Sequence, residues 1–172
     1  EDGVVEAQYE AVVVGTGGAF AAWLLVSLIS LVSNVVWFGK FSLVAESLAH
    51  AHPSLWMLVV PVIGGLIIGL MARFGSEKIR GHGIPEAIEA ILIGGSRMSP
   101  KVAVLKPLSS AISIGTGGPF GAEGPIIMTG GAIGSLFAQC FEMSSAERKS
   151  LLVAGAAAGM TAIFGTPIAA LL

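Results

Sequence analysis

Long intervals without a charged side chain constrain the fold of this chain more than any other feature. No Asp, Glu, Lys or Arg occurs between Glu10 and Lys40, or between Glu46 and Arg73, and two further uncharged intervals follow later in the chain. Each interval is long enough for a helix to cross the roughly 30 Å hydrocarbon layer of a bilayer. The pattern therefore predicts an integral membrane protein that crosses the membrane several times.

Composition supports this prediction and excludes other classes of protein. The 172 residues are 54% hydrophobic and 12% charged, whereas soluble domains carry about 25% charged residues. The net charge of −2 is small and the basic residues form no single stripe, so we expect a lipid bilayer as partner and no nucleic acid. Acidic residues precede the first apolar interval, which indicates a retained span and not a signal peptide.

The apolar segments and their breakers predict an all-α membrane protein with several spans and re-entrant, broken half-helices. The segment 81–94 is too short to span and contains Glu86 and Glu89, so we interpret it as a half-helix that starts at Pro85 and returns to the same side. The basic segments 73–80 and 97–106 would then share the cytoplasmic side. The expected helices are 7–36, 53–74, 85–94, 102–113, 125–141 and 150–164, with a polar turn at 142–149 and another helix from Pro167.

Pairs of glycines four residues apart predict close contacts between helices. They occur at Gly65 and Gly69, at Gly130 and Gly134, and at Gly155 and Gly159. Small residues at this spacing let two helix backbones approach each other in a membrane. We expect these glycines to serve packing and not ligand binding.

Two short segments break a helix and restart it with a proline in the first turn. They are Gly81-His82-Gly83-Ile84-Pro85-Glu86 and Gly121-Ala122-Glu123-Gly124-Pro125. A restarted helix exposes free backbone N–H groups at the positive end of its dipole, and glycine allows a ligand to approach them. Two such ends directed at one place would bind an anion without a cationic side chain, which favours release as well as binding.

Glu123 lies at the second break, far in sequence from any other charge. An ionisable residue inside a membrane is costly, so it indicates a function. The carboxylate would compete with an anion for the helix N-terminus, and its protonation would open the path. The alternative is that Glu123 only caps the helix that follows it.

The order of these segments resembles the CLC family of chloride channels and chloride/proton antiporters. The resemblance rests on Gly83-Ile84-Pro85-Glu86, on Gly121 to Pro125, and on Gly155-Ala156-Ala157-Ala158-Gly159 followed by Phe164-Gly165-Thr166-Pro167. It implies a homodimer in which each subunit has a pore built from two inverted halves. We expect residues 1–172 to be the N-terminal half, truncated before the second half.

The resemblance also implies which residues meet the anion. Glu123 would be the gating and proton-accepting glutamate. The implied anion-binding residues are Gly81, His82, Gly83, Ala122, Glu123 and Gly124. Two of them depart from the family pattern, because His82 stands where Ser is usual and Ala122 where Arg is usual. His82 leaves the choice of anion open and could instead bond only a loop carbonyl, while Ala122 reduces the positive potential at the pathway.

The predicted function is transport of chloride or a related inorganic anion, as a channel or an anion/proton antiporter. No catalytic residue, metal site or cofactor is expected besides the transported anion and protons, and the expected location is the plasma membrane. The sequence has no Gly-x-Ser-x-Gly or His-Glu-x-x-His motif, and its glycine-rich run lacks the Lys-Ser/Thr of a phosphate loop. The alternative is a degenerate membrane scaffold that transports nothing.

Overall fold

The computed structural model describes residues 2–47, 55–81, 83–141 and 143–171, and helices make up most of them. No β-strand occurs in these ranges, so the expected all-α class is confirmed. The helices are α1 (Asp2–Phe38), α2 (Trp56–Phe74), the short 3-10 helix η2 (Glu77–Ile79), α3 (Ile84–Leu92), α4 (Pro100–Gly115), α5 (Glu123–Cys140), α6 (Ser145–Phe164) and α7 (Pro167–Leu171).

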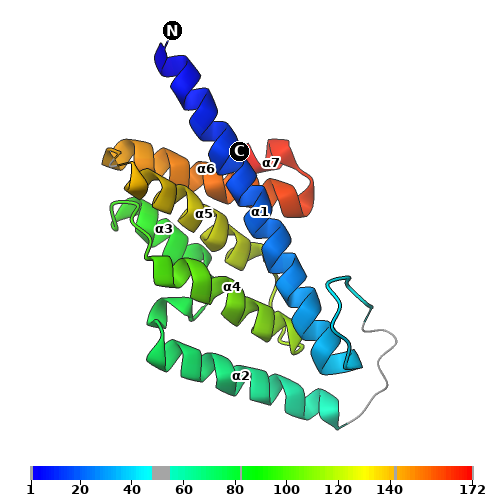
Figure 1. The fold of residues 1–172 in the computed structure, drawn as a ribbon. Helices are drawn as coiled ribbons and strands as arrows, with labels where there is room; N and C mark the ends of the chain where they lie inside the picture. The colour runs from blue at the N-terminus through cyan, green and yellow to red at the C-terminus, as the bar shows by residue number, and fades with distance from the viewer. Residues whose placement is uncertain (1, 48–54, 82, 142, 172) are drawn as a thin grey trace.

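Helix α1 runs along the whole molecule and α4, α5 and α6 pack against it (Figure 1). The N-terminal turns of α1 project beyond the other helices, and α2 lies on the outer side of α4 (Figure 1). The hydrophobic core lies between these packed helices. Its apolar cluster of Ala21, Ala22, Leu25 and Ile126 joins α1 to the beginning of α5. Three further residues, Val14, Ala138 and Leu151, continue that core toward the other end of α5 and α6.

Glycines bring α5 and α6 into backbone contact. A Cβ atom added at Gly130 would meet the carbonyl oxygen of Gly155, and one added at Gly134 would meet that of Leu151. A Cβ atom at Gly159 would lie 3.0 Å from a side-chain carbon of Ile126. The predicted packing role of these glycines is confirmed, since side chains at these positions would push the two helices apart.

Helix α2 is the least buried of the long helices. It buries Val60, Gly64 and Ala72, while most of its apolar side chains point outward. No atom of the described residues lies within 4 Å of a Cβ atom added at Gly65 or Gly69, so the predicted close contact at that pair does not form within this part of the chain. Because the rest of the helix is apolar, its outer face suits lipid or further protein.

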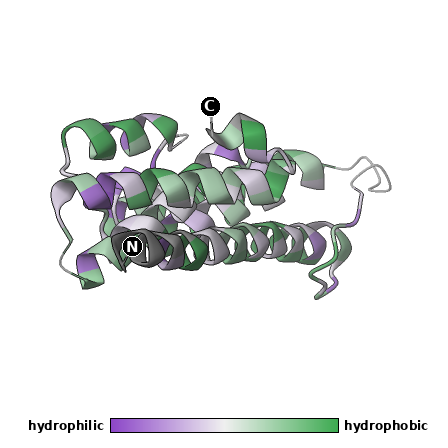
Figure 2. Cartoon of the chain, turned by 90° about the horizontal axis from the view of Figure 1, so that it is seen from above, coloured by the Kyte–Doolittle hydropathy of each residue, from purple (hydrophilic) through white to green (hydrophobic). Residues whose placement is uncertain are grey.

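Among the described residues, two helices are long and apolar enough to cross a membrane by length and composition. They are the stretch Val12–Phe38 of α1 and Trp56–Phe74, which is all of α2. Figure 2 shows these and the other helices coloured mostly white to green, with purple in short stretches near helix ends and in loops. An outward-facing apolar surface of this kind is expected of a protein that is surrounded by lipid.

The predicted polar turn at 142–149 is wrong over most of its length. Helix α6 already begins at Ser145, because Ser144 and Glu147 form a capping box in which each side chain bonds the backbone N–H of the other residue. Hydrogen bonds from Ser144 hold the pKa of the Glu147 carboxyl below its usual range. Arg148 is buried in the first turn and donates to the Met143 carbonyl over 2.9 Å, while Glu142 lies outside the described residues.

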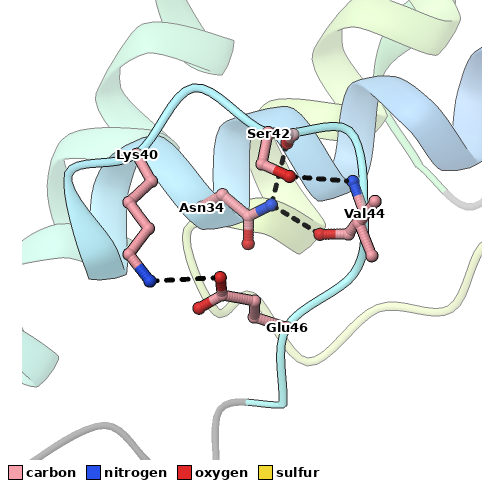
Figure 3. A network of polar contacts seen from close by, with 5 residues as sticks. All are labelled: Asn34, Lys40, Ser42, Val44 and Glu46. Atoms are coloured by element: carbon pink, nitrogen blue, oxygen red, sulfur yellow. Dashed lines mark hydrogen bonds and ion pairs between the residues drawn. The ribbon is translucent and has the colours of Figure 1, made fainter.

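The segment after α1 folds back on that helix (Figure 3). Asn34 is fully buried, and its amide nitrogen donates to the carbonyl oxygens of Ser42 over 2.8 Å and of Val44 over 2.7 Å. Lys40 and Glu46 form an exposed ion pair of 3.2 Å beside them. These contacts stabilise the end of α1 without using any of the predicted site residues.

Candidate functional site

The first predicted break in a helix lies between η2 and α3. Gly81 and Gly83 have φ angles of 79° and 101°, which favour glycine, and α3 begins at Ile84 with Pro85 in its first turn. The predicted short half-helix is therefore confirmed as an element. His82, the residue that departs from the family pattern, lies outside the described residues.

The second predicted break separates α4 from α5. The chain leaves helical conformation after Gly115, passes Gly117 with a φ of 90°, and resumes at Glu123. Helix α5 thus starts two residues before the expected Pro125. Proline is tolerated there because the first N–H groups of a helix have no partner within the helix.

The two restarted helices meet at their N-terminal ends. A Cβ atom added at Gly83 would lie 3.0 Å from the carbonyl oxygen of Gly124 and 2.8 Å from Cγ of Met128. Gly83 caps the N-terminus of α3, and Gly124 is the second residue of α5. The fold therefore brings together residues of the two breaks that are far apart in the sequence.

Unpaired backbone donors remain at both helix starts. The first bond of α5 runs from Ile126 N to Ala122 O over 3.0 Å, and that of α3 from Ala87 N to Gly83 O over 3.0 Å. Among the described residues, the N–H groups of Glu123 and Gly124 have no acceptor. Free N–H groups at the positive end of a helix dipole attract negative charge, so this end of α5 can bind an anion or a carboxylate.

Glu123 is not covered by the rest of this chain. The sequence predicts a carboxylate within the membrane, and its side chain is exposed among the described residues. Within the described ranges it forms no hydrogen bond or ion pair, and its Cδ lies 3.8 Å from where Gly121 would carry a Cβ atom. Nothing in this part of the fold holds the carboxylate in one position.

Ala122, the second departure from the family pattern, precedes α5 and is half-buried. Its side chain packs against the apolar cluster of Ala21, Ala22, Leu25 and Ile126, which joins α1 to α5. A long cationic side chain pointing the same way would enter apolar surroundings. The alanine therefore fits the packing between α1 and α5 at this position.

A cavity of about 290 Å³ lies beside the two breaks. Its walls come from α2, from the backbone between η2 and α3, from α4, and from the segment that leads into α5. Gly81 belongs to the lining from the first break, and Gly121 and Pro125 from the second. Of the predicted anion-binding residues, Gly81 thus faces this cavity, while Gly83 and Gly124 form the contact behind it.

Lys106 is a polar residue at this site that the sequence analysis did not single out. It belongs to the basic segment 97–106 and to the expected helix 102–113. It lies in α4, as expected, but it is 1% exposed and lines the cavity. Its Nζ donates to the carbonyl oxygens of Ile79 over 3.1 Å and of Gly81 over 2.8 Å. The local sequence signal of its burial is its place inside an apolar helix, between Leu105 and Pro107. Its hydrogen-bond partners are remote in sequence, so the sequence does not reveal them.

Comparison with known proteins identifies the family. Residues 63–172 match the sequence profile described as "Voltage gated chloride channel", and this stretch contains both breaks and their contact. The chain belongs to the voltage-gated chloride channel family. The resemblance to CLC proteins and the predicted membrane fold are thereby confirmed.

The chain shares 30–36% sequence identity with relatives named as chloride channels or exchange transporters. It is 36% identical over 125 residues to a putative chloride channel protein, ClcB-like, of Ralstonia nicotianae, an alignment that covers 70% of the chain and 29% of that relative. It is 35% identical to the H(+)/Cl(-) exchange transporter ClcA of Vibrio campbellii, over 69% of the chain and 26% of the relative. A ClcA of Salmonella schwarzengrund is 30% identical, over 95% of the chain and 34% of the relative.

The chain thus spans roughly a quarter to a third of the length of these family members. The alignment with the Salmonella relative covers 95% of the chain and therefore includes the helix starts described above. None of the comparisons tests the individual residues, so the gating role of Glu123 and the anion contacts of the glycines stay predictions.

Proposed function

We propose that the complete protein containing this chain moves chloride or a related inorganic anion across a membrane, along a path that passes the joined starts of α3 and α5. The observation that carries this proposal is the contact of Gly83 with Gly124, which joins two helix N-termini in a chain of the voltage-gated chloride channel family. The names of the relatives, chloride channel and H(+)/Cl(-) exchange transporter, support chloride as the anion.

Glu123 is the gate in this proposal. Its carboxylate is the first side chain of α5 and has no bonded partner within the described chain, so it is free to move toward or away from the helix end. When ionised, it competes with the anion for the N–H groups of Glu123 and Gly124. When protonated, it loses that attraction and leaves the helix end to the anion.

The test is anion flux from liposomes that contain the complete protein, with Glu123→Gln compared to wild type. If only the protonated gate is open, wild-type flux should fall by about tenfold per pH unit where the carboxylate is mostly ionised. Glu123→Gln removes the titration, so its flux should stay high and vary little with pH. Glu77→Gln, at an exposed residue of helix η2, is the matched control and should behave as wild type.

Each result has a definite meaning. A pH profile of Glu123→Gln that matches wild type would show that this residue is not the gate. Absence of chloride flux in every variant, with correctly inserted protein, would favour the alternative of a scaffold that transports nothing. Proton uptake measured during chloride efflux separates an exchanger from a channel, and crosslinking in the bilayer tests the proposed homodimer.

A further inference from the structure

We infer that Lys106 is a positioning residue for the anion pathway: its ammonium group fixes the backbone that leads into α3, and so keeps the start of α3 against the start of α5. The role differs from that of a side chain that touches the anion. This inference rests on the proposed function. It adds Lys106 to the same site as the residue that holds the backbone before α3 in place.

The contacts of Lys106 are directed at the backbone of one loop. Its Nζ bonds the carbonyl oxygens of Ile79 and Gly81, which lie on either side of Arg80. Burying an ammonium group costs several kcal/mol unless polar partners compensate. At 1% exposure, Lys106 depends on those two carbonyls and on attraction to the Glu86 carboxylate.

The loop that Lys106 holds is one that would otherwise move easily. Gly81 and Gly83 both have positive φ angles, and glycine passes between backbone conformations at little cost. Hydrogen bonds from a charged donor are about twice as strong as neutral ones. Two such bonds to this short segment therefore restrict it to one conformation.

The position of this loop decides the geometry of the site. Gly83 follows Gly81 closely and caps the N-terminus of α3. A Cβ atom added to it would lie 3.0 Å from the carbonyl oxygen of Gly124. A displaced loop would separate the two helix starts. The ammonium also engages the negative ends of the Ile79 and Gly81 carbonyls beside the cavity, so these oxygens do not repel an anion there.

The experiment measures chloride flux against chloride concentration for the complete protein in liposomes. Lys106→Met keeps an apolar side chain of similar length and removes the charge and both hydrogen bonds, so we expect its KM for chloride to rise by at least roughly tenfold. Lys101→Met changes an exposed lysine of the same helix α4 and should leave KM unchanged. A variant whose maximal flux falls with an unchanged KM would contradict the inference.

A rescue experiment separates charge from volume and from failure to fold. Lys106→Cys, in a background with Cys140→Ala because Cys140 is exposed, is treated with 2-aminoethyl methanethiosulfonate, which rebuilds an ammonium group on the side chain. We expect low KM to return with this reagent and not with neutral methyl methanethiosulfonate. Equal rescue by both reagents would mean that Lys106 only fills space.

Amide hydrogen exchange tests the role of Lys106 separately from the proposed function, because it does not depend on chloride flux. The backbone amides of residues 80, 81, 83 and 84 should exchange at least roughly tenfold faster in Lys106→Met than in Lys101→Met, whether or not the protein moves chloride. Absence of flux in wild type together with this faster exchange would overturn the proposed function and leave the loop-fixing role in place. Unchanged exchange would overturn that role even in a protein that transports chloride.

Discussion

Gly83 meets two separate constraints, one on its backbone and one on the space beside it. Its φ of 101° is rarely adopted by other residues, and an added Cβ atom would press on Gly124 and Met128. Gly95 meets only the first constraint, because its φ is 59° and nothing lies within 4 Å of an added Cβ atom. Comparing alanine substitutions at Gly83 and Gly95 therefore separates the free-energy cost of backbone strain from that of steric crowding.

Replacing Gly83 by Ala should impair the site more than replacing Gly95. Strain alone costs about 1–2 kcal/mol at either position, and crowding adds about 1–3 kcal/mol at Gly83. We expect Gly83→Ala to lower both the unfolding midpoint and chloride flux, while Gly95→Ala lowers the midpoint slightly and keeps the flux. Thermal unfolding in detergent and liposome flux measure the two effects, and equal losses in both variants would contradict this account.

At the scale of elements, the contact of α5 with α6 depends on bare backbone. Gly134→Ala would drive a methyl group into the carbonyl of Leu151 and should destabilise the protein by about 1–3 kcal/mol. Gly69→Ala is the control, since Gly69 lies in α2 with open space around it and alanine favours a helix by about 1 kcal/mol. Unfolding by denaturing detergent should rank Gly134→Ala below wild type and Gly69→Ala at or above it; the opposite order would disprove the role of Gly134.

The boundaries of the helices were predicted from the sequence with mixed success. Helix starts at α3 and α5 were found to within a few residues because glycine and proline mark them locally. The start of α6 was missed because Ser144 and Glu147, three residues apart, form a capping box within what looked like a polar turn. The contact of Gly83 with Gly124 and the hydrogen bonds of Lys106 to the carbonyls of Ile79 and Gly81 depend on tertiary packing, which no local pattern records.

At the scale of the whole molecule, the outward apolar surface is the property that most needs a membrane. Leu66 in the middle of α2 is 64% exposed, and Leu43 in the segment after α1 is 55% exposed. In water the two leucines would be nearly equivalent. In a bilayer Leu66 faces an apolar medium, whereas Leu43 lies in the loop that carries the exposed ion pair of Lys40 and Glu46.

Leu66→Asp should therefore block membrane insertion and Leu43→Asp should not. An aspartate at the centre of a membrane helix costs about 3 kcal/mol. We expect the ratio of integrated to non-integrated protein to fall by about a hundredfold for Leu66→Asp in a membrane-extraction assay, with Leu43→Asp near wild type. Equal insertion of both variants would mean that the exposed face of α2 does not contact lipid.

The position of helix α1 indicates how deep in the bilayer the candidate site lies. Leu25 is the middle residue of the apolar stretch Val12–Phe38, and it is fully buried in a cluster with Ile126 of the first turn of α5. If Val12–Phe38 spans the bilayer symmetrically, Leu25 lies at the midplane and the beginning of α5 lies near half depth. An unpaired carboxylate at that depth requires a water-filled passage, or cover from protein outside this chain, within reach of Glu123.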